Sequence, residues 1–224
     1  MRGGLEASVA RALEGLAAPA RDAAAGAQPA LAAFLELLLE ENTRTNLVSA
    51  RSAEPDALAR HLADVLSGAP FLPPPRTTPV RLLDVGSGGG LPAIPLLLVR
   101  RDVEGTLVES VGKKCAFLRA AAARLALTLA VVNARFPGSF DMTTHGSYDV
   151  LTTRAVGTAG RLVRAARPVL AGGARALLWT TEPLVREAVR ESRAGAWVFH
   201  ADRASRQRGL LVLEGCGGTG ERST

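Results

Sequence analysis

The chain has 224 residues, of which 47% are hydrophobic and 21% are charged. These ordinary values exclude a disordered chain, a collagen-like chain and a small disulfide-stapled scaffold. The formal net charge is +6, and 25 of the 27 basic residues are arginine. Guanidinium groups suit phosphate and guanine, so this balance favours an anionic partner. A GC-rich genome also produces arginine in excess, so the charge alone does not establish nucleic-acid binding.

Cysteine usage and the N-terminal residues indicate the compartment. Cys115 and Cys216 are too few for a disulfide framework or a zinc site, and no C-x-x-C motif is present. Charged residues at Glu6, Arg11 and Glu14 interrupt the Ala-rich N-terminus, which therefore does not predict a signal peptide. No apolar run approaches the length of a membrane span. We expect a cytoplasmic protein with no membrane segment and no metal.

The first 72 residues have the pattern of a helical cap. Residues 5–40 are rich in Ala, Leu and Glu and predict two helices with a break over 19–29. Another helix is predicted to begin at Pro55, with an apolar face formed by Leu58, Leu62, Val65 and Leu66. The proline-rich segment 73–79 predicts a stiff linker.

After the linker, short apolar runs alternate with helical patterns, which predicts an α/β domain over residues 80–214. Alternation at this spacing predicts a mostly parallel sheet covered on both faces. Strands are expected at 81–85, 105–109, 127–132, 148–152 and 174–179, and helices at 91–101, 113–125 and 158–170. A helix near 184–191 and two antiparallel strands at 196–199 and 209–213 follow, and residues 215–224 are expected to be a frayed tail.

The strongest local motif is a glycine-rich loop after the first strand, with the sequence Asp84-Val85-Gly86-Ser87-Gly88-Gly89-Gly90. Such a loop brings a ligand close to backbone amides at the carboxyl end of a parallel sheet. The dinucleotide fingerprint G-x-G-x-x-G fails because Leu91 occupies its last position. The form D-x-G-x-G-x-G instead resembles class I S-adenosylmethionine-dependent methyltransferases.

Glu109 ends the next strand, where a carboxylate can accept both hydrogens of a ribose diol. Nicotinamide and S-adenosylmethionine folds share this device. Glu109 therefore indicates an adenosine ligand without choosing between the two cofactors.

Further motifs carry a more specific resemblance, over about residues 30–180. They are Asn46-Leu47-Val48-Ser49, Arg60-His61-Leu62-Ala63-Asp64, the run Gly88–Pro95, the run Val108–Arg119, and Thr153-Arg154-Ala155. This set resembles the RsmG family, also called glucose-inhibited division protein B. Its members methylate N7 of a guanine in 16S ribosomal RNA.

The resemblance implies S-adenosylmethionine as the cofactor and a set of residues that bind it. Gly86 and Leu91 would line its methyl side, Glu109 would hold the ribose, and Phe136 would lie against the adenine. The full implied set is Asp84, Gly86, Ser87, Gly88, Leu91, Glu109, Arg135, Phe136, Pro137 and Arg154.

On the substrate side, the resemblance implies catalytic roles for Arg154, His61 and Asp64, and RNA contacts for Arg51, Arg60 and Lys113. The partner would be 16S ribosomal RNA or a precursor of the small ribosomal subunit, and we expect a monomer. Guanine N7 has a lone pair and no proton, so its attack on a methyl group needs alignment rather than a general base.

The sequence departs from the family at three places. Pro137 replaces an acidic residue at the adenine edge, Trp179-Thr180-Thr181 stands where Lys-Gly is common, and Val48 replaces threonine. Two alternatives therefore stay open: a methyltransferase of this fold with a small-molecule substrate, and a non-catalytic paralogue that binds RNA or S-adenosylmethionine.

Overall fold

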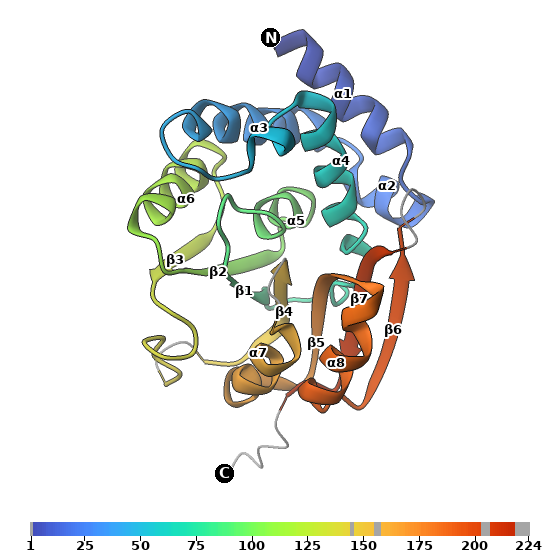
Figure 1. Ribbon diagram of the computed structural model, residues 1–224, viewed down its shortest axis with the longest axis vertical. Helices are drawn as coiled ribbons and strands as arrows, with labels where there is room; N and C mark the ends of the chain where they lie inside the picture. Colours follow the sequence, from blue (N-terminus) through green and yellow to red (C-terminus); the bar gives the residue numbers. More distant parts are fainter. Residues whose placement is uncertain (1, 144–145, 155–157, 203–206, 218–224) are drawn as a thin grey trace.

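The computed structural model describes residues 2–143, 146–154, 158–202 and 207–217. Its centre is one sheet with the strand order β3-β2-β1-β4-β5-β7-β6 (Figure 1). The strands β1 to β5 pair in parallel, and β7 is antiparallel to both of its neighbours. The predicted α/β class with an antiparallel final strand is confirmed. The strand bounds are Val80–Val85, Val103–Glu109, Leu129–Asn133, Tyr148–Arg154, Leu170–Thr181, Ala196–Ala201 and Arg208–Glu214 for β1 to β7.

Helices cover the two faces of the sheet and form two apolar clusters (Figure 1). One cluster contains α5 (Ala93–Val99), α6 (Gly112–Arg124) and the N-terminal helices. The other contains α7 (Ala159–Ala166) and α8 (Glu182–Ser192). The expected helix 158–170 stops at Ala166 and continues as a 3-10 turn, Arg167–Val169, because Pro168 cannot continue the α-helical hydrogen bonding.

The N-terminal region forms three helices before residue 50 rather than the expected two. They are α1 (Arg2–Glu14), α2 (Ala18–Ala24) and α3 (Gln28–Asn42). The region expected to be a break contains α2, because Pro19 lies in its first turn, where a missing N–H costs no hydrogen bond. The predicted helix at Pro55 is confirmed as α4 (Pro55–Leu66).

The cap shares its core with the sheet. Leu31, Phe34 and Leu38 of α3 are fully buried in the same cluster as Leu82 of β1 and Ile94 of α5. Burial of a side chain of this size contributes about 1.5–3 kcal/mol. The cap is therefore held to the sheet by apolar packing, and the division at residues 73–79 stays a prediction.

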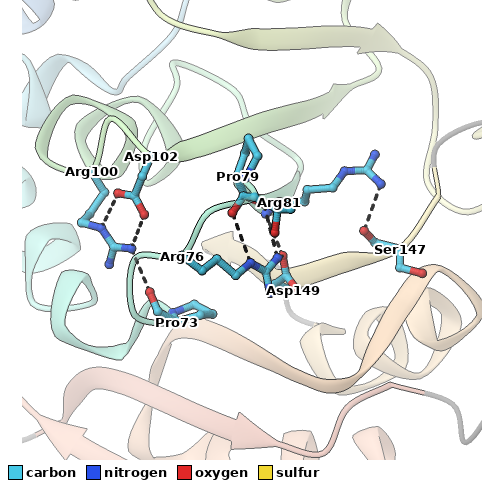
Figure 2. Close-up of polar contacts among 9 residues, drawn as sticks. Pro73, Arg76, Pro79, Arg81, Arg100, Asp102, Ser147 and Asp149 are labelled. Atoms are coloured by element: carbon cyan, nitrogen blue, oxygen red, sulfur yellow. Dashed lines mark hydrogen bonds and ion pairs between the residues drawn. The ribbon is translucent and has the colours of Figure 1, made fainter.

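Arginines bind the proline-rich segment to the amino-terminal edge of the sheet (Figure 2). Arg76 forms an ion pair with Asp149, whose carboxylate also accepts a hydrogen bond from the backbone N–H of Arg81 at 2.9 Å. Arg100 donates to the carbonyl of Pro73 at 2.8 Å and pairs with Asp102. The predicted linker is thus a fixed connection.

The start of the predicted frayed tail is also fixed. Cys216 is buried, and its N–H donates to the carbonyl of Ala174 at 3.0 Å. The expectation is therefore wrong for residues 215–217, because β5 supplies a backbone acceptor. Residues 218–224 lie outside the described residues.

Among the described residues, no single helix has the length and apolar character needed to cross a membrane. The pair α2 and α3 meets that test only when taken together, by length and composition, and is bent by 81°.

We predict that Gly160→Ala destabilises the protein. A Cβ at Gly160 of α7 would lie 2.4 Å from the carbonyl oxygen of Ala188 in α8. The resulting clash should lower the free energy of unfolding by about 1–3 kcal/mol, outweighing the better helix propensity of alanine. Urea unfolding measures the change. Gly172→Ala is the control, because nothing lies within 4 Å of its Cβ position. Equal stability of the two variants would contradict the close packing of α7 on α8.

Candidate methyl-transfer site

The glycine-rich loop joins β1 to α5 at the carboxyl end of the sheet. Gly86, Gly88 and Gly90 have positive φ angles of 77°, 54° and 86°. At Gly90 a Cβ would also lie 2.6 Å from Cδ1 of Ile94, so the position requires glycine on two grounds. The N–H of Gly86 donates to the carbonyl of Val108 at 2.9 Å and ties the loop to β2.

Asp84 is a buried carboxylate at the end of β1. Its Oδ1 accepts a hydrogen bond from Oγ1 of Thr152 in β4 at 2.7 Å. Its Oδ2 is buried and has no hydrogen-bond partner among the described residues. Burial raises the pKa of Asp84 to about 6, against the lowering effect of the bond from Thr152. The free oxygen fits a ligand that brings a donor or a positive charge.

Glu109 ends β2 and faces the loop. Its Oε2 accepts from the N–H of Gly88 at 2.9 Å, and its Oε1 accepts from the N–H of Val111 at 2.8 Å. Each carboxylate oxygen has a second lone pair, so both can accept further hydrogen bonds. The backbone therefore fixes this carboxylate in an orientation suited to a diol.

A cavity of about 590 Å³ opens beside Glu109. This volume suits a nucleoside-sized ligand. Of the predicted cofactor residues, five line the cavity: Gly86, Glu109, Arg135, Phe136 and Pro137. Sequence reasoning missed the other lining residues, four of which lie on or next to α7: Thr158, Arg161, Leu162 and Ala165. The only signal for these four was the helical pattern after the fourth strand, which does not say which helix face meets the ligand.

The other predicted cofactor residues, Asp84, Ser87, Gly88, Leu91 and Arg154, are not on this wall. Ser87 is buried, and its hydroxyl donates to the carbonyl of Asp84 at 3.2 Å. Gly88 reaches the site through its bond to Glu109. Leu91 is half-buried and packs against the cluster that contains the N-terminal helices. The roles assigned to these residues stay predictions.

Arg154, His61 and Asp64 meet in space as expected for a shared site. Arg154 at the end of β4 has its Nη2 2.8 Å from Nδ1 of His61 and 3.3 Å from Oδ2 of Asp64. A guanidinium only donates, so Nδ1 of His61 must accept, and the imidazole is neutral with its hydrogen on Nε2. That nitrogen lies 3.3 Å from Oγ of Ser52, which accepts the hydrogen.

The electrostatics of this cluster agree with a neutral imidazole. Burial, and then the charge of Arg154, lower the pKa of His61 to about 4. Burial raises the pKa of Asp64, against the opposing effect of Arg154. The guanidinium is thus held by one neutral acceptor and one carboxylate.

The predicted RNA-binding residues are exposed and lie on three different elements. Arg51 lies in a 3-10 turn, Ala50–Ser52, and Arg60 lies in α4, on either side of the Ser52–His61 bond. Lys113 lies in the first turn of α6, after the strand that ends at Glu109.

Trp179 lies inside β5, which continues to Thr181. Its ring is buried, and its Nε1–H donates to the carbonyl of Asp64 at 2.9 Å. Among the described residues, no group of three or more His, Cys, Asp or Glu side chains is arranged to hold a metal.

Solved structures show the same fold at low sequence identity. An O-methyltransferase family protein from Burkholderia thailandensis has a TM-score of 0.53 at 13% identity, covering 84% of this chain and 72% of its own. The T. thermophilus 16S rRNA N2 G1207 methyltransferase RsmC, solved with AdoMet and guanosine, has a TM-score of 0.52 at 20% identity, covering 69% of this chain and 42% of its own. The fold is that of class I S-adenosylmethionine-dependent methyltransferases.

Sequence comparison gives the family. The protein from Leptothrix cholodnii named ribosomal RNA small subunit methyltransferase G is 39% identical over 145 residues, which are 64% of this chain and 65% of that protein. The protein of the same name from Nitrobacter hamburgensis is 34% identical over 198 residues, covering 79% of this chain and 72% of its own. The chain thus spans just under two thirds of the first relative. The family profile described as rRNA small subunit methyltransferase G matches residues 27–200. The resemblance is confirmed, and the chain belongs to the rRNA small subunit methyltransferase G family.

Proposed function

We propose that the protein transfers a methyl group from S-adenosylmethionine to N7 of a guanine in 16S ribosomal RNA. The observation that carries the proposal is that acidic side chains and Arg154 lie at the same edge of the sheet. Glu109 lines a cavity of about 590 Å³, the unpartnered Oδ2 of Asp84 lies buried in the neighbouring strand β1, and Arg154 ends the next strand, β4. Family membership and the fold support the same reaction class.

The residues present fit the cofactor. The free Oδ2 of Asp84 suits the ammonium group of its methionine part, and Glu109 suits its ribose hydroxyls. Phe136 and Pro137 give the adenine an apolar wall. When bound, S-adenosylmethionine supplies a methyl group made electrophilic by its sulfonium.

The protein's own part in the reaction is alignment. Arg154, held by His61 and Asp64, would donate hydrogen bonds to acceptor atoms of the guanine and orient the base with its N7 toward the methyl group. His61 cannot serve as a base while its Nδ1 accepts from Arg154, and attack by N7 requires none. Extrusion of the target base from its RNA loop would precede this step. We place the protein in the cytoplasm, where ribosomal RNA is its substrate.

A small-molecule methyltransferase and a non-catalytic binder are the alternatives. The first is disfavoured by the exposed arginines at 51 and 60. The second predicts RNA or S-adenosylmethionine binding without turnover.

Methyl transfer from labelled S-adenosylmethionine to 16S rRNA from a strain that lacks the modification tests the proposal. We expect label in N7-methylguanine, identified by mass mapping of the RNA. Arg154→Ala should lower kcat/KM for RNA by about 100-fold, since a charged donor used in alignment is lost, while calorimetry shows little change in cofactor affinity. Binding without incorporation would favour the non-catalytic alternative.

Glu109→Gln should weaken S-adenosylmethionine binding by about 10- to 100-fold, because a charged acceptor of hydrogen bonds is replaced by an amide. Calorimetry of the binding measures the loss. Glu104→Gln is the matched control, because Glu104 is an exposed carboxylate on the same strand. Equal affinities of the two variants would remove Glu109 from the cofactor site.

The pKa of Asp84 predicts a pH-dependent stability of the ligand-free protein. The folded state keeps a proton up to about pH 6, which the unfolded chain releases near its ordinary value of 3.8. Stability contributed by this group therefore falls as pH rises from about 4 to 6 and is constant above, by up to about 3 kcal/mol. Asp84→Asn should remove this fall, as measured by urea unfolding between pH 4 and 7. Parallel pH profiles of the two proteins would show that Asp84 titrates normally.

A further inference from the structure

A second guanidinium lies on the same face of the sheet as Arg154. Directly paired residues on neighbouring strands point to the same face. Arg154 of β4 pairs with Trp179 of β5, and Trp179 pairs with Leu210 of β7. Arg208 is two residues from Leu210, so its side chain projects from this face too.

The sheet register also sets how far Arg208 lies along the strands. It pairs with Thr181, the last residue of β5, two positions beyond Trp179 toward the carboxyl end of the parallel strands. This is the edge at which Glu109 and Arg154 end their strands and at which Asp84 is the last residue but one of β1. Arg208 is exposed, whereas Trp179 is buried.

Helix α4 covers this face and brings His61 and Asp64, which hold Arg154, next to Arg208. The Trp179 indole holds the carbonyl of Asp64, and a Cβ on Gly68 would lie 2.6 Å from Cζ2 of its ring. The charge of Arg208 is also among the causes that lower the pKa of His61 and of Asp64. Register, helix packing and electrostatics thus agree that Arg208 borders the cluster.

The charged groups around this cluster leave a net positive charge beside Arg208. The charge of Arg154 is compensated by Asp64 at 3.3 Å. Arg60 and Arg208 add two exposed positive charges around this pair, and Asp202 adds one negative charge whose effect reaches Asp64. Trp179, at the position where family members commonly carry lysine, contributes no charge.

We propose that Arg208 is an RNA-binding residue that binds a backbone phosphate beside the target guanine, next to Arg154. The inference rests on the proposed function, because it takes RNA as the ligand. Arginine suits this task, since its planar fork donates two parallel hydrogen bonds to phosphate oxygens.

The test measures RNA binding and methyl transfer separately. The probe is 16S rRNA from the strain without the modification, titrated by filter binding at several salt concentrations and used as substrate with saturating S-adenosylmethionine. Arg208→Ala should raise the Kd and KM for RNA by about 5- to 10-fold and reduce the slope of log Kd against log salt by about 0.7 to 1, as expected for one lost phosphate contact. Its kcat should stay within about twofold of the wild-type value, and its affinity for S-adenosylmethionine should be unchanged.

Two variants control for charge and folding. Arg208→Lys keeps the positive charge and should retain most of the salt slope. Arg186→Ala removes an exposed arginine from α8, on the opposite face of the sheet, and should leave RNA binding and KM unchanged. Thermal unfolding of all the variants separates lost binding from lost folding.

The outcomes distinguish this inference from the proposed function. A wild-type Kd and salt slope in a folded Arg208→Ala variant would overturn the role of Arg208 while wild-type methylation stands. A loss of S-adenosylmethionine affinity in that variant would overturn it as well, because Arg208 would then act on the cofactor or its loop. If the wild-type protein transfers no methyl group, the proposed reaction fails, and the salt slope still decides whether Arg208 contacts RNA phosphate.

Discussion

Parallel pairing of β1 with β2 and β4 is the constraint on which the site depends. The register sets Asp84 beside Thr152 and Val85 beside Val108, so the strands end at one edge with Asp84, Glu109 and Arg154 near each other. All three strands are largely buried, and a shift by one residue would reverse every side chain. Apolar packing on both faces of the sheet therefore fixes the positions of these three charged side chains.

Helix α4 positions His61 and Asp64 relative to the sheet. Its apolar face, with Leu58 and Leu62 fully buried, holds the helix against the core. Its polar positions then meet the sheet edge, where Asp64 pairs with Arg154 through its side chain and with Trp179 through its carbonyl. The cap thus completes the site, since His61 and Asp64 both come from a helix that precedes the sheet in the sequence.

The sequence predicted the parts of this arrangement that local patterns determine. The alternation of strands and helices, with the glycine-rich loop, predicted the fold, and the acidic residue at the end of the second strand predicted the position of Glu109. The resemblance to the family predicted that His61, Asp64 and Arg154 belong to one site. The prolines over 19–29 predicted a break where Pro19 in fact lies in the first turn of α2. Local patterns could not predict the fixed proline-rich segment, which depends on Arg76 and Asp149 far apart in the chain. They also could not identify Arg161 or Arg208. A helix pattern or a strand register shows which side chains face the site only once the neighbouring element is known.

Two pairs of charged side chains at this edge of the sheet differ in sign. Asp84 and Glu109 are the acidic pair, and Glu109 lines the cavity together with Arg135 and Arg161. Arg154 and Arg208 are the basic pair, which in the proposed function meets a guanine edge and a phosphate. His61 is a neutral imidazole whose nitrogens are both engaged, at Arg154 and Ser52. A nucleophile that carried a proton would need a free base there. Guanine N7 needs none, so in the proposed reaction the hydrogen bonds of His61 serve entirely to hold the guanidinium of Arg154.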